Sequence, residues 1–136
     1  MQITVETTIA APIERVWQMY TNPDDISQWN AASDDWHTTT TRVDLRVGGA
    51  FCARMEAKDG SMGFDFEGVY THIVEHELIE YDFFERHARV EFAEGSNGVT
   101  VSITFDAETE NTPQAQREGW QAILDNFARH VMAQQA

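Results

Sequence analysis

The sequence contains little cysteine, little positive charge and no long hydrophobic run. Cys52 is the only cysteine among 136 residues, so no internal disulfide can form, and this composition favours a cytoplasmic protein. Only 9 residues are Lys or Arg against 23 Asp or Glu, a formal net charge of −14, which argues against nucleic acid and anionic membrane surfaces as partners. No apolar run reaches the roughly 18 residues of a membrane-spanning helix, and no charged and apolar leader precedes the first strand pattern. We therefore expect neither a membrane segment nor a secretory signal.

The sequence also lacks the patterns of a catalytic or metal centre. No serine-protease-like triad, Cys-His pair, dinucleotide-binding motif or zinc signature occurs. His72 and His76 stand four residues apart, but no third ligand is signalled, and we interpret them as surface histidines. Cys52 has no assignable base, and the neighbouring carboxylates Asp34 and Asp35 are expected to be solvated. We therefore expect no metal, no cofactor and no catalytic residue, and we favour, without requiring, a non-enzymatic protein.

The hydrophobic periodicity predicts one α+β domain over residues 1–136. The predicted elements are a strand at 2–9, short helices at about 12–20 and 23–29, about six strands between 36 and 105, and a long helix at about 112–134. One apolar helix stripe facing an amphipathic antiparallel sheet indicates a two-layer arrangement. We expect a curved antiparallel sheet wrapped around the long C-terminal helix, with the two short helices after the first strand.

Residues with strong local preferences mark the ends of these elements. Pro12 suits the first position of the first helix, and Asn22 and Thr112 suit the N-caps of the second and the last helix. Gly48-Gly49 interrupts an extended segment predicted at Trp36–Val47. These positions predict where the chain changes direction.

Four segments resemble one known family. They are Ala11–Trp17, whose helix leads on to Trp29, the strand and glycine corner Asp44–Phe51, the strand Phe66–Tyr70 with a glycine before the aromatic residue, and Glu118-Gly119-Trp120 followed by Ile123-Leu124. In this order and spacing they resemble the START-like (SRPBCC, helix-grip) superfamily, and within it the family similar to the activator of heat-shock protein 90 ATPase. The resemblance implies the helix-grip fold with a cavity between sheet and helix. It does not specify an activity, because one fold serves many functions.

Two glycines bear on that cavity. Gly119 lies inside a helical pattern, where glycine costs about 1 kcal/mol relative to alanine. Close approach of the helix to the sheet is the favoured explanation, and room for a ligand is the alternative. Gly68 and Gly119 both remove side chains where filling of the interior is expected.

The resemblance and the alternation of strand residues together predict the cavity lining. The predicted ligand-binding residues are Trp29, Met55, Phe66, Tyr81, Phe92, Phe105, Trp120 and Leu124. We expect them to hold a small hydrophobic or aromatic molecule. A closed aromatic core made by the same residues remains the alternative.

The sequence is compatible with three functions. The first is non-enzymatic binding of a small hydrophobic ligand by a monomer or homodimer. The second is an enzyme similar to the polyketide cyclases and aromatases of the superfamily, which a buried acid or base inside the pocket would favour. The third is a co-chaperone-like protein-interaction module, which an exposed apolar patch on the outer face of the sheet would favour.

Overall fold

The computed structural model describes residues 1–134, which form a seven-stranded antiparallel sheet and three helices. In chain order the elements are β1 (Gln2–Ile9), α1 (Ile13–Thr21), α2 (Pro23–Trp29), β2 (Trp36–Val43), β3 (Ala50–Ala57), β4 (Gly63–Val74), β5 (Leu78–Phe83), β6 (Arg86–Gly95), β7 (Gly98–Asp106) and α3 (Pro113–Ala133). The strands are ordered β1-β7-β6-β5-β4-β3-β2. Each strand from β2 onward therefore pairs with its neighbour in sequence, and β1 closes the far edge beside β7.

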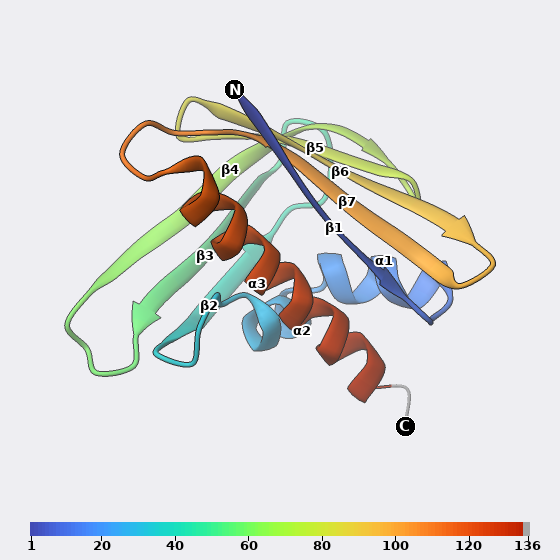
Figure 1. Cartoon of the computed structure of the whole chain (residues 1–136), viewed down its shortest axis with the longest axis horizontal. Helices are drawn as coiled ribbons and strands as arrows, with labels where there is room; N and C mark the ends of the chain where they lie inside the picture. Colours follow the sequence, from blue (N-terminus) through green and yellow to red (C-terminus); the bar gives the residue numbers. More distant parts are fainter. Residues whose placement is uncertain (135–136) are drawn as a thin grey trace.

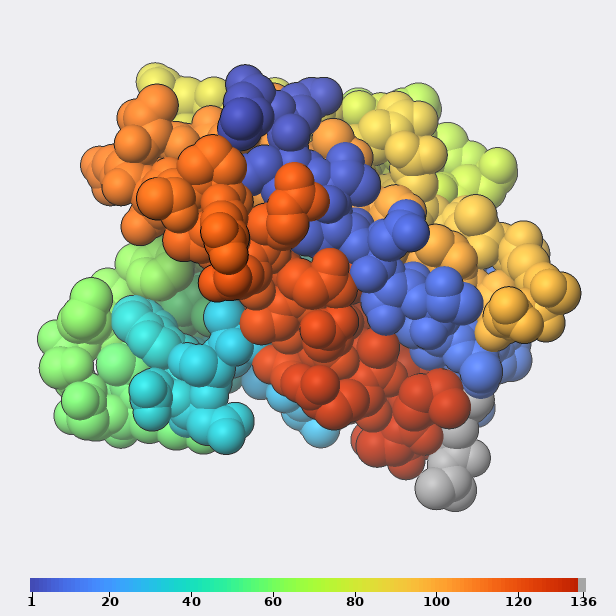
Figure 2. Space-filling view, viewed as in Figure 1, coloured from blue at the N-terminus to red at the C-terminus, as the bar shows by residue number. Residues whose placement is uncertain are grey.

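The sheet curls around α3, and α1 and α2 lie beside that helix (Figure 1). This is the arrangement predicted from the sequence, and the predicted α+β helix-grip fold is confirmed. In the space-filling view α3 lies against β1 on one side, while β2 and the β3–β4 hairpin form the flank on the other side (Figure 2). The helix therefore sits closer to one edge of the sheet than to the other.

Alternating side chains in β7 explain how the sheet acquires a buried face. Its apolar residues are between 0% and 5% exposed, and they are Val99, Val101, Ile103 and Phe105. The intervening threonines face outward, where Thr100 and Thr104 pair with Thr8 and Thr4 of β1 through their hydroxyl groups. The period of two in the sequence thus becomes one apolar face toward α3 and one polar face toward solvent.

The predicted caps are confirmed at two helices and shifted by one residue at the third. The Asn22 side chain accepts a hydrogen bond from the backbone N–H of Asp24, and the Thr112 hydroxyl accepts one from that of Ala115. Pro12, however, has an extended backbone (φ −64°, ψ 147°) and is the N-cap of α1 rather than its first helical residue. The ring of proline tolerates this extended conformation as well as a helical one.

The extended segment predicted at Trp36–Val47 is too long, because β2 ends at Val43. The chain then turns back, with Arg46 forming an ion pair with the Asp44 carboxylate at 2.8 Å. Gly48 has φ +84°, a value that glycine adopts without strain, and its N–H donates to the Tyr70 carbonyl at 2.8 Å. This contact with β4 replaces the last part of the predicted strand by a loop.

Candidate functional site

A cavity of about 440 Å³ lies between the sheet and the middle of α3. Apolar and aromatic side chains provide most of its wall, which comes from α1, α2, α3 and six strands of the sheet, β2 to β7. The wall residues are Tyr20, Thr21, Ile26, Trp29, Asn30, Ala32, Thr41, Val43, Phe51, Ala53, Met55, Phe64, Phe66, Tyr70, Ile79, Tyr81, Phe84, Arg86, Ile103, Gly119, Trp120, Ile123 and Leu124. A volume of this size and lining is typical of pockets for small organic molecules.

Gly119 borders the cavity, and the expectation of a close helix–sheet contact at this residue is wrong. Among residues 1–134, a Cβ atom placed on Gly119 would meet no heavy atom within 4 Å apart from its chain neighbours and the nearby backbone of α3. The position is therefore open space rather than a tight contact, which is the alternative that the sequence left open. Within residues 1–134, α3 contacts β1 and the two short helices more extensively than it contacts β2 or β3.

Gly68 behaves in the opposite way and does not contribute empty space. A Cβ atom on Gly68 would come within 2.7 Å of the Phe51 ring, its partner across β3 and β4, and within 2.5 Å of the Asp82 carbonyl oxygen. The Phe51 ring thus occupies the gap left by the missing side chain and contacts Tyr70 with ring centroids 5.2 Å apart. The expectation that Gly68 leaves part of the interior unfilled is wrong.

The structure brings six of the eight predicted lining residues to this wall: Trp29, Met55, Phe66, Tyr81, Trp120 and Leu124. The other two lie outside it. Phe105 is fully buried beneath the indole of Trp120, with ring centroids 3.9 Å apart, and Phe92 packs between Trp17 and Tyr20. Both lie on the inner face of the sheet, as their strand positions require. The Trp120 ring covers Phe105, and the rings of Trp17 and Tyr20 cover Phe92. That these residues bind a ligand remains a prediction.

Two polar side chains near the wall are already hydrogen-bonded within the protein. The Trp29 indole N–H donates to the Met19 carbonyl at 3.0 Å, which fixes α2 against α1. The Thr41 hydroxyl pairs with that of Ser27 at 2.8 Å. These groups therefore hold the wall in place rather than offering free hydrogen-bonding capacity to a ligand.

The three tyrosine hydroxyls are different. Within residues 1–134, no hydrogen bond joins the hydroxyl of Tyr20, Tyr70 or Tyr81 to another group, although Tyr70 and Tyr81 are only 7% and 8% exposed. No fully enclosed side-chain nitrogen or oxygen in this part of the chain lacks a partner, so these hydroxyls must face open space. All three tyrosines line the cavity.

Burial is the main reason that all three phenols resist ionisation. It raises the pKa of Tyr20, with a smaller contribution from the charge of Tyr70, and it raises the pKa of Tyr70 with a smaller contribution from Asp44. The pKa of Tyr81 is raised well above its usual value by burial and by the other two phenols, against a weaker opposing effect of Arg86. The hydroxyls are therefore neutral donors throughout the physiological range.

We expect the folded protein to show no phenolate absorbance in the near ultraviolet until the pH is well above 10. Each folded-state pKa lies above the unfolded one, so the associated stability is fully present below about pH 10 and is lost as the pH rises. Phenolate formation should therefore coincide with the loss of native circular dichroism in an alkaline titration. A tyrosine that ionises reversibly near pH 10 in the folded protein would contradict this placement.

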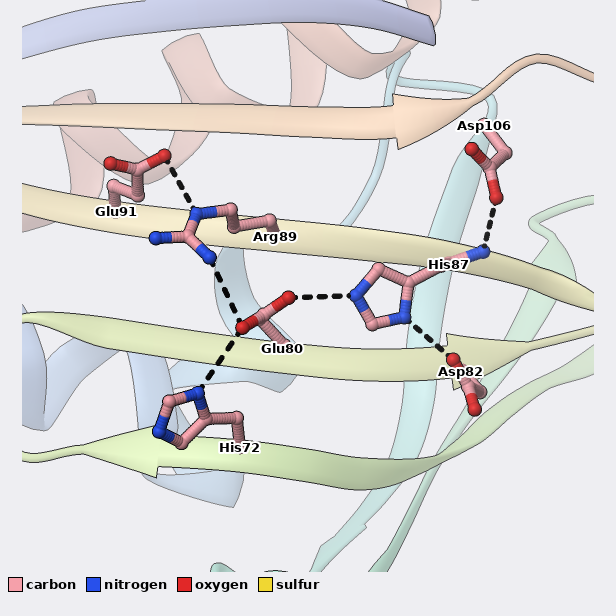
Figure 3. Close-up of polar contacts among 7 residues, drawn as sticks. All are labelled: His72, Glu80, Asp82, His87, Arg89, Glu91 and Asp106. Carbon is pink, nitrogen blue, oxygen red and sulfur yellow. Dashed lines mark hydrogen bonds and ion pairs between the residues drawn. The ribbon is translucent and has the colours of Figure 1, made fainter.

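A network of charged side chains covers the opposite, outer face of β4 to β7 (Figure 3). At its centre the Glu80 carboxylate accepts hydrogen bonds from His72, His87 and Arg89 at 2.9–3.2 Å. The second ring nitrogen of His87 lies 2.6 Å from the Asp82 carboxylate, and hydrogen bonding to Asp82 and then Glu80 raises the pKa of His87. Hydrogen bonding from His87 is in turn the largest effect that lowers the pKa of Glu80.

The side chains of this network face away from the cavity, because Glu80 and Asp82 alternate with Tyr81 along β5. Its members are mostly exposed, so their ion pairs are screened by water and contribute little stability each. His72 is placed on the surface as predicted. No group of three or more His, Cys, Asp or Glu side chains in residues 1–134 is arranged to hold a metal ion.

The geometry now defines a class of protein: a helix-grip domain in which a curled antiparallel sheet and a C-terminal helix enclose an apolar cavity. Residues 10–132 match the family described as "Activator of Hsp90 ATPase homolog 1-like protein", and the chain belongs to that family, within the START-like superfamily. The resemblance inferred from the sequence is therefore confirmed. No curated protein matches the chain significantly.

Solved structures of relatives share the fold over nearly the whole chain. An AHSA1-like protein from Aeromonas hydrophila is 50% identical, with 99% of this chain and 94% of that chain covered and a TM-score of 0.94. A protein from Cytophaga hutchinsonii is 40% identical, with 98% and 94% covered and a TM-score of 0.85. A protein from Nitrosomonas europaea, 21% identical with 99% and 96% covered, has a TM-score of 0.82 and shows the fold alone.

Sequence reasoning did not place Tyr20, Tyr70, Arg86 or Gly119 among the predicted site residues, although all four border the cavity. Tyr70 could have been found, because it alternates with Phe66 and Gly68 on the inner face of β4. Tyr20 belongs to the apolar stripe of α1, and nothing in that stripe distinguishes a cavity residue from a core residue.

None of the helices in residues 1–134 is both long and apolar enough to cross a membrane.

Proposed function

We propose that this protein binds a small apolar, mainly aromatic molecule in the cavity between the sheet and α3, without catalysing a reaction. The observation that carries the proposal is the cavity of about 440 Å³ with a wall of aromatic and aliphatic side chains. Burial of a ligand's apolar surface there would contribute roughly 25 cal/mol per Å² before the costs of association. We further propose that residues 1–136 act as a single START-like domain in the cytoplasm, with the small molecule as its partner.

The composition of the wall supports binding over catalysis. Among its described residues there is no Asp, Glu, His, Lys or Cys, the groups that commonly act as general acids, bases or nucleophiles. Arg86 is the one charged residue of the described wall, and its guanidinium lies over the Phe83 ring at 4.7 Å while its Nε–H donates to the Asp106 carbonyl. The described wall therefore offers the cyclase-like alternative Arg86 and three tyrosines, but no carboxylate, histidine or lysine to serve as a base.

The outer face of the sheet also gives little support to the interaction-module alternative. That face carries the charged network around Glu80 across β4 to β6 rather than a continuous apolar patch. Val69 is an exposed apolar residue near this network, at 44%, whereas Phe84, at 54%, lies between β5 and β6 and borders the cavity. Isolated residues of this kind are ordinary on protein surfaces.

Filling the open space at Gly119 tests the proposal. We expect the uncharged dye N-phenyl-1-naphthylamine to bind the wild-type protein saturably, with increased dye fluorescence. Gly119→Phe should weaken this binding by at least about tenfold, because the added ring competes for space beside the cavity. Gly119→Ala should retain binding and stabilise the protein by roughly 1 kcal/mol, since it removes a helix-interior glycine without a steric clash.

The matched control is Ala115→Phe, which adds the same ring to an exposed position one turn earlier in α3, outside the cavity wall. It should bind the dye as the wild type does. Urea unfolding monitored by circular dichroism establishes that each variant is folded. Unchanged dye binding by folded Gly119→Phe, or no saturable binding by the wild type, would overturn the proposed function.

A further inference from the structure

All three tyrosines of the chain are collected at one cavity. Tyr70 and Tyr81 are directly opposite each other on β4 and β5, so their side chains leave the sheet on the same face. Tyr20 comes from α1 and stacks on Trp29 with ring centroids 5.3 Å apart. Elements far apart in sequence thus bring three phenol groups close enough for their charges to influence one another.

Buried polar groups in proteins are nearly always hydrogen-bonded, and buried tyrosines usually find a partner for their hydroxyl. Tyr70 and Tyr81 are more than nine-tenths buried, yet their hydroxyls meet no partner among residues 1–134, and both residues line the cavity. Three tyrosine hydroxyls at one apolar cavity are therefore available as hydrogen-bond donors to a molecule bound there. An oxygen atom of a ligand can accept hydrogen bonds from such donors, whereas a pure hydrocarbon cannot.

We propose that Tyr20, Tyr70 and Tyr81 form the polar end of the cavity, and that the ligand presents to them an uncharged acceptor oxygen, such as a ketone or quinone carbonyl, on a flat aromatic body. This inference rests on the proposed function and specifies its ligand class. The aromatic body follows from the remaining wall, where the rings of Trp29, Phe66 and Trp120 offer faces and edges for stacking.

The charges around the tyrosines favour a neutral acceptor over an anion. Asp44 acts on Tyr70 through its negative charge, and the whole chain carries a formal charge of −14. Arg86 lowers the pKa of Tyr81 against the larger effects that raise it, while its guanidinium lies over the Phe83 ring and its Nε–H donates to the Asp106 carbonyl. An anionic ligand would lose its hydration shell in an apolar cavity, with Arg86 as the one compensating cation of the described wall.

Matched probes separate the acceptor oxygen from the hydrophobic body. Fluorene and 9-fluorenone have almost the same shape, but only fluorenone carries a carbonyl oxygen, and fluorene-9-carboxylate supplies the anionic comparison. Equilibrium dialysis of each probe against the wild-type protein gives its dissociation constant. The same measurement is made with the triple variant Tyr20→Phe, Tyr70→Phe, Tyr81→Phe, which removes the hydroxyls and keeps the rings.

We expect the triple substitution to weaken fluorenone binding by at least about tenfold while leaving fluorene binding unchanged. The variant should unfold at the same urea concentration as the wild type, because the hydroxyls have no hydrogen-bond partner to lose in the part of the chain that the structure describes. Equal effects on the two probes, or a large loss of stability, would overturn the inference and leave the proposed function intact. Tighter binding of the carboxylate than of fluorenone would overturn the preference for a neutral acceptor. Failure of all three probes to bind the wild type would overturn the proposed function and this inference with it.

Discussion

Replacing Trp120 by alanine is expected to lower the free energy of unfolding by about 3 kcal/mol. The indole of Trp120 is stacked on Phe105, with ring centroids 3.9 Å apart and an interplanar angle of 10°, and it lies 5.7 Å from the Phe83 ring. Truncation removes these contacts and enlarges a cavity that already exists. Because Trp120 is itself partly exposed at the cavity, we expect a loss at the lower end of the range for Trp→Ala changes.

Urea unfolding with an unchanged dependence on denaturant measures this loss. Trp120→Phe is the matched control, because it retains an aromatic ring over Phe105 and should cost clearly less than the alanine change. A loss below about 1 kcal/mol for Trp120→Ala would show that the stacked ring pair does not hold α3 on the sheet.

A second large effect is expected at Phe127, where alanine should cost about 4 kcal/mol. Phe127 is 0% exposed and packs edge-on against Trp29 and Tyr20, with ring centroids 4.9 and 5.1 Å away. It therefore joins α3 to both short helices. Its removal leaves an empty space that three helices would have to close, and rigid elements of this kind relax only in part.

Phe127→Leu is the control for this position, since it keeps most of the apolar volume and should lose less than half as much stability. Both variants are compared with wild type by urea unfolding. If the alanine variant were as stable as the leucine variant, the helices would have to repack around the site. The structure would then be less rigid at this junction than its close ring contacts indicate.

The local patterns of the sequence were sufficient to predict the elements of this fold. Val99, Val101, Ile103 and Phe105 alternate without exception, and such a period of two is satisfied only by a strand with one buried face. Asn22 and Thr112 were predictable as caps because a side-chain oxygen there bonds to a backbone N–H only two or three residues away. Interactions over such short separations depend little on the rest of the chain.

The cavity was only partly predictable, because a face of a strand does not reveal what covers it. Phe92 and Phe105 point to the same face as Tyr81, yet α1 and the Trp120 ring cover them while Tyr81 borders open space. Sequence alternation specifies the face on which a residue lies. The distance from that face to α3 depends on how the helix is held at β1 and α2.

By itself, the sequence determined the order of the elements, their inward faces and the family. Each of these depends on periodicity or on motifs within a short stretch of chain. Only the tertiary structure decided that Gly119 borders open space while the Phe51 ring fills the gap at Gly68. It also decided that Tyr20, Tyr70 and Tyr81 line one cavity with hydroxyls that have no hydrogen-bond partner among residues 1–134. The physical reason is that a cavity, or a donor without a partner, depends on which other side chains come near it. Those side chains come from segments that are distant in the sequence.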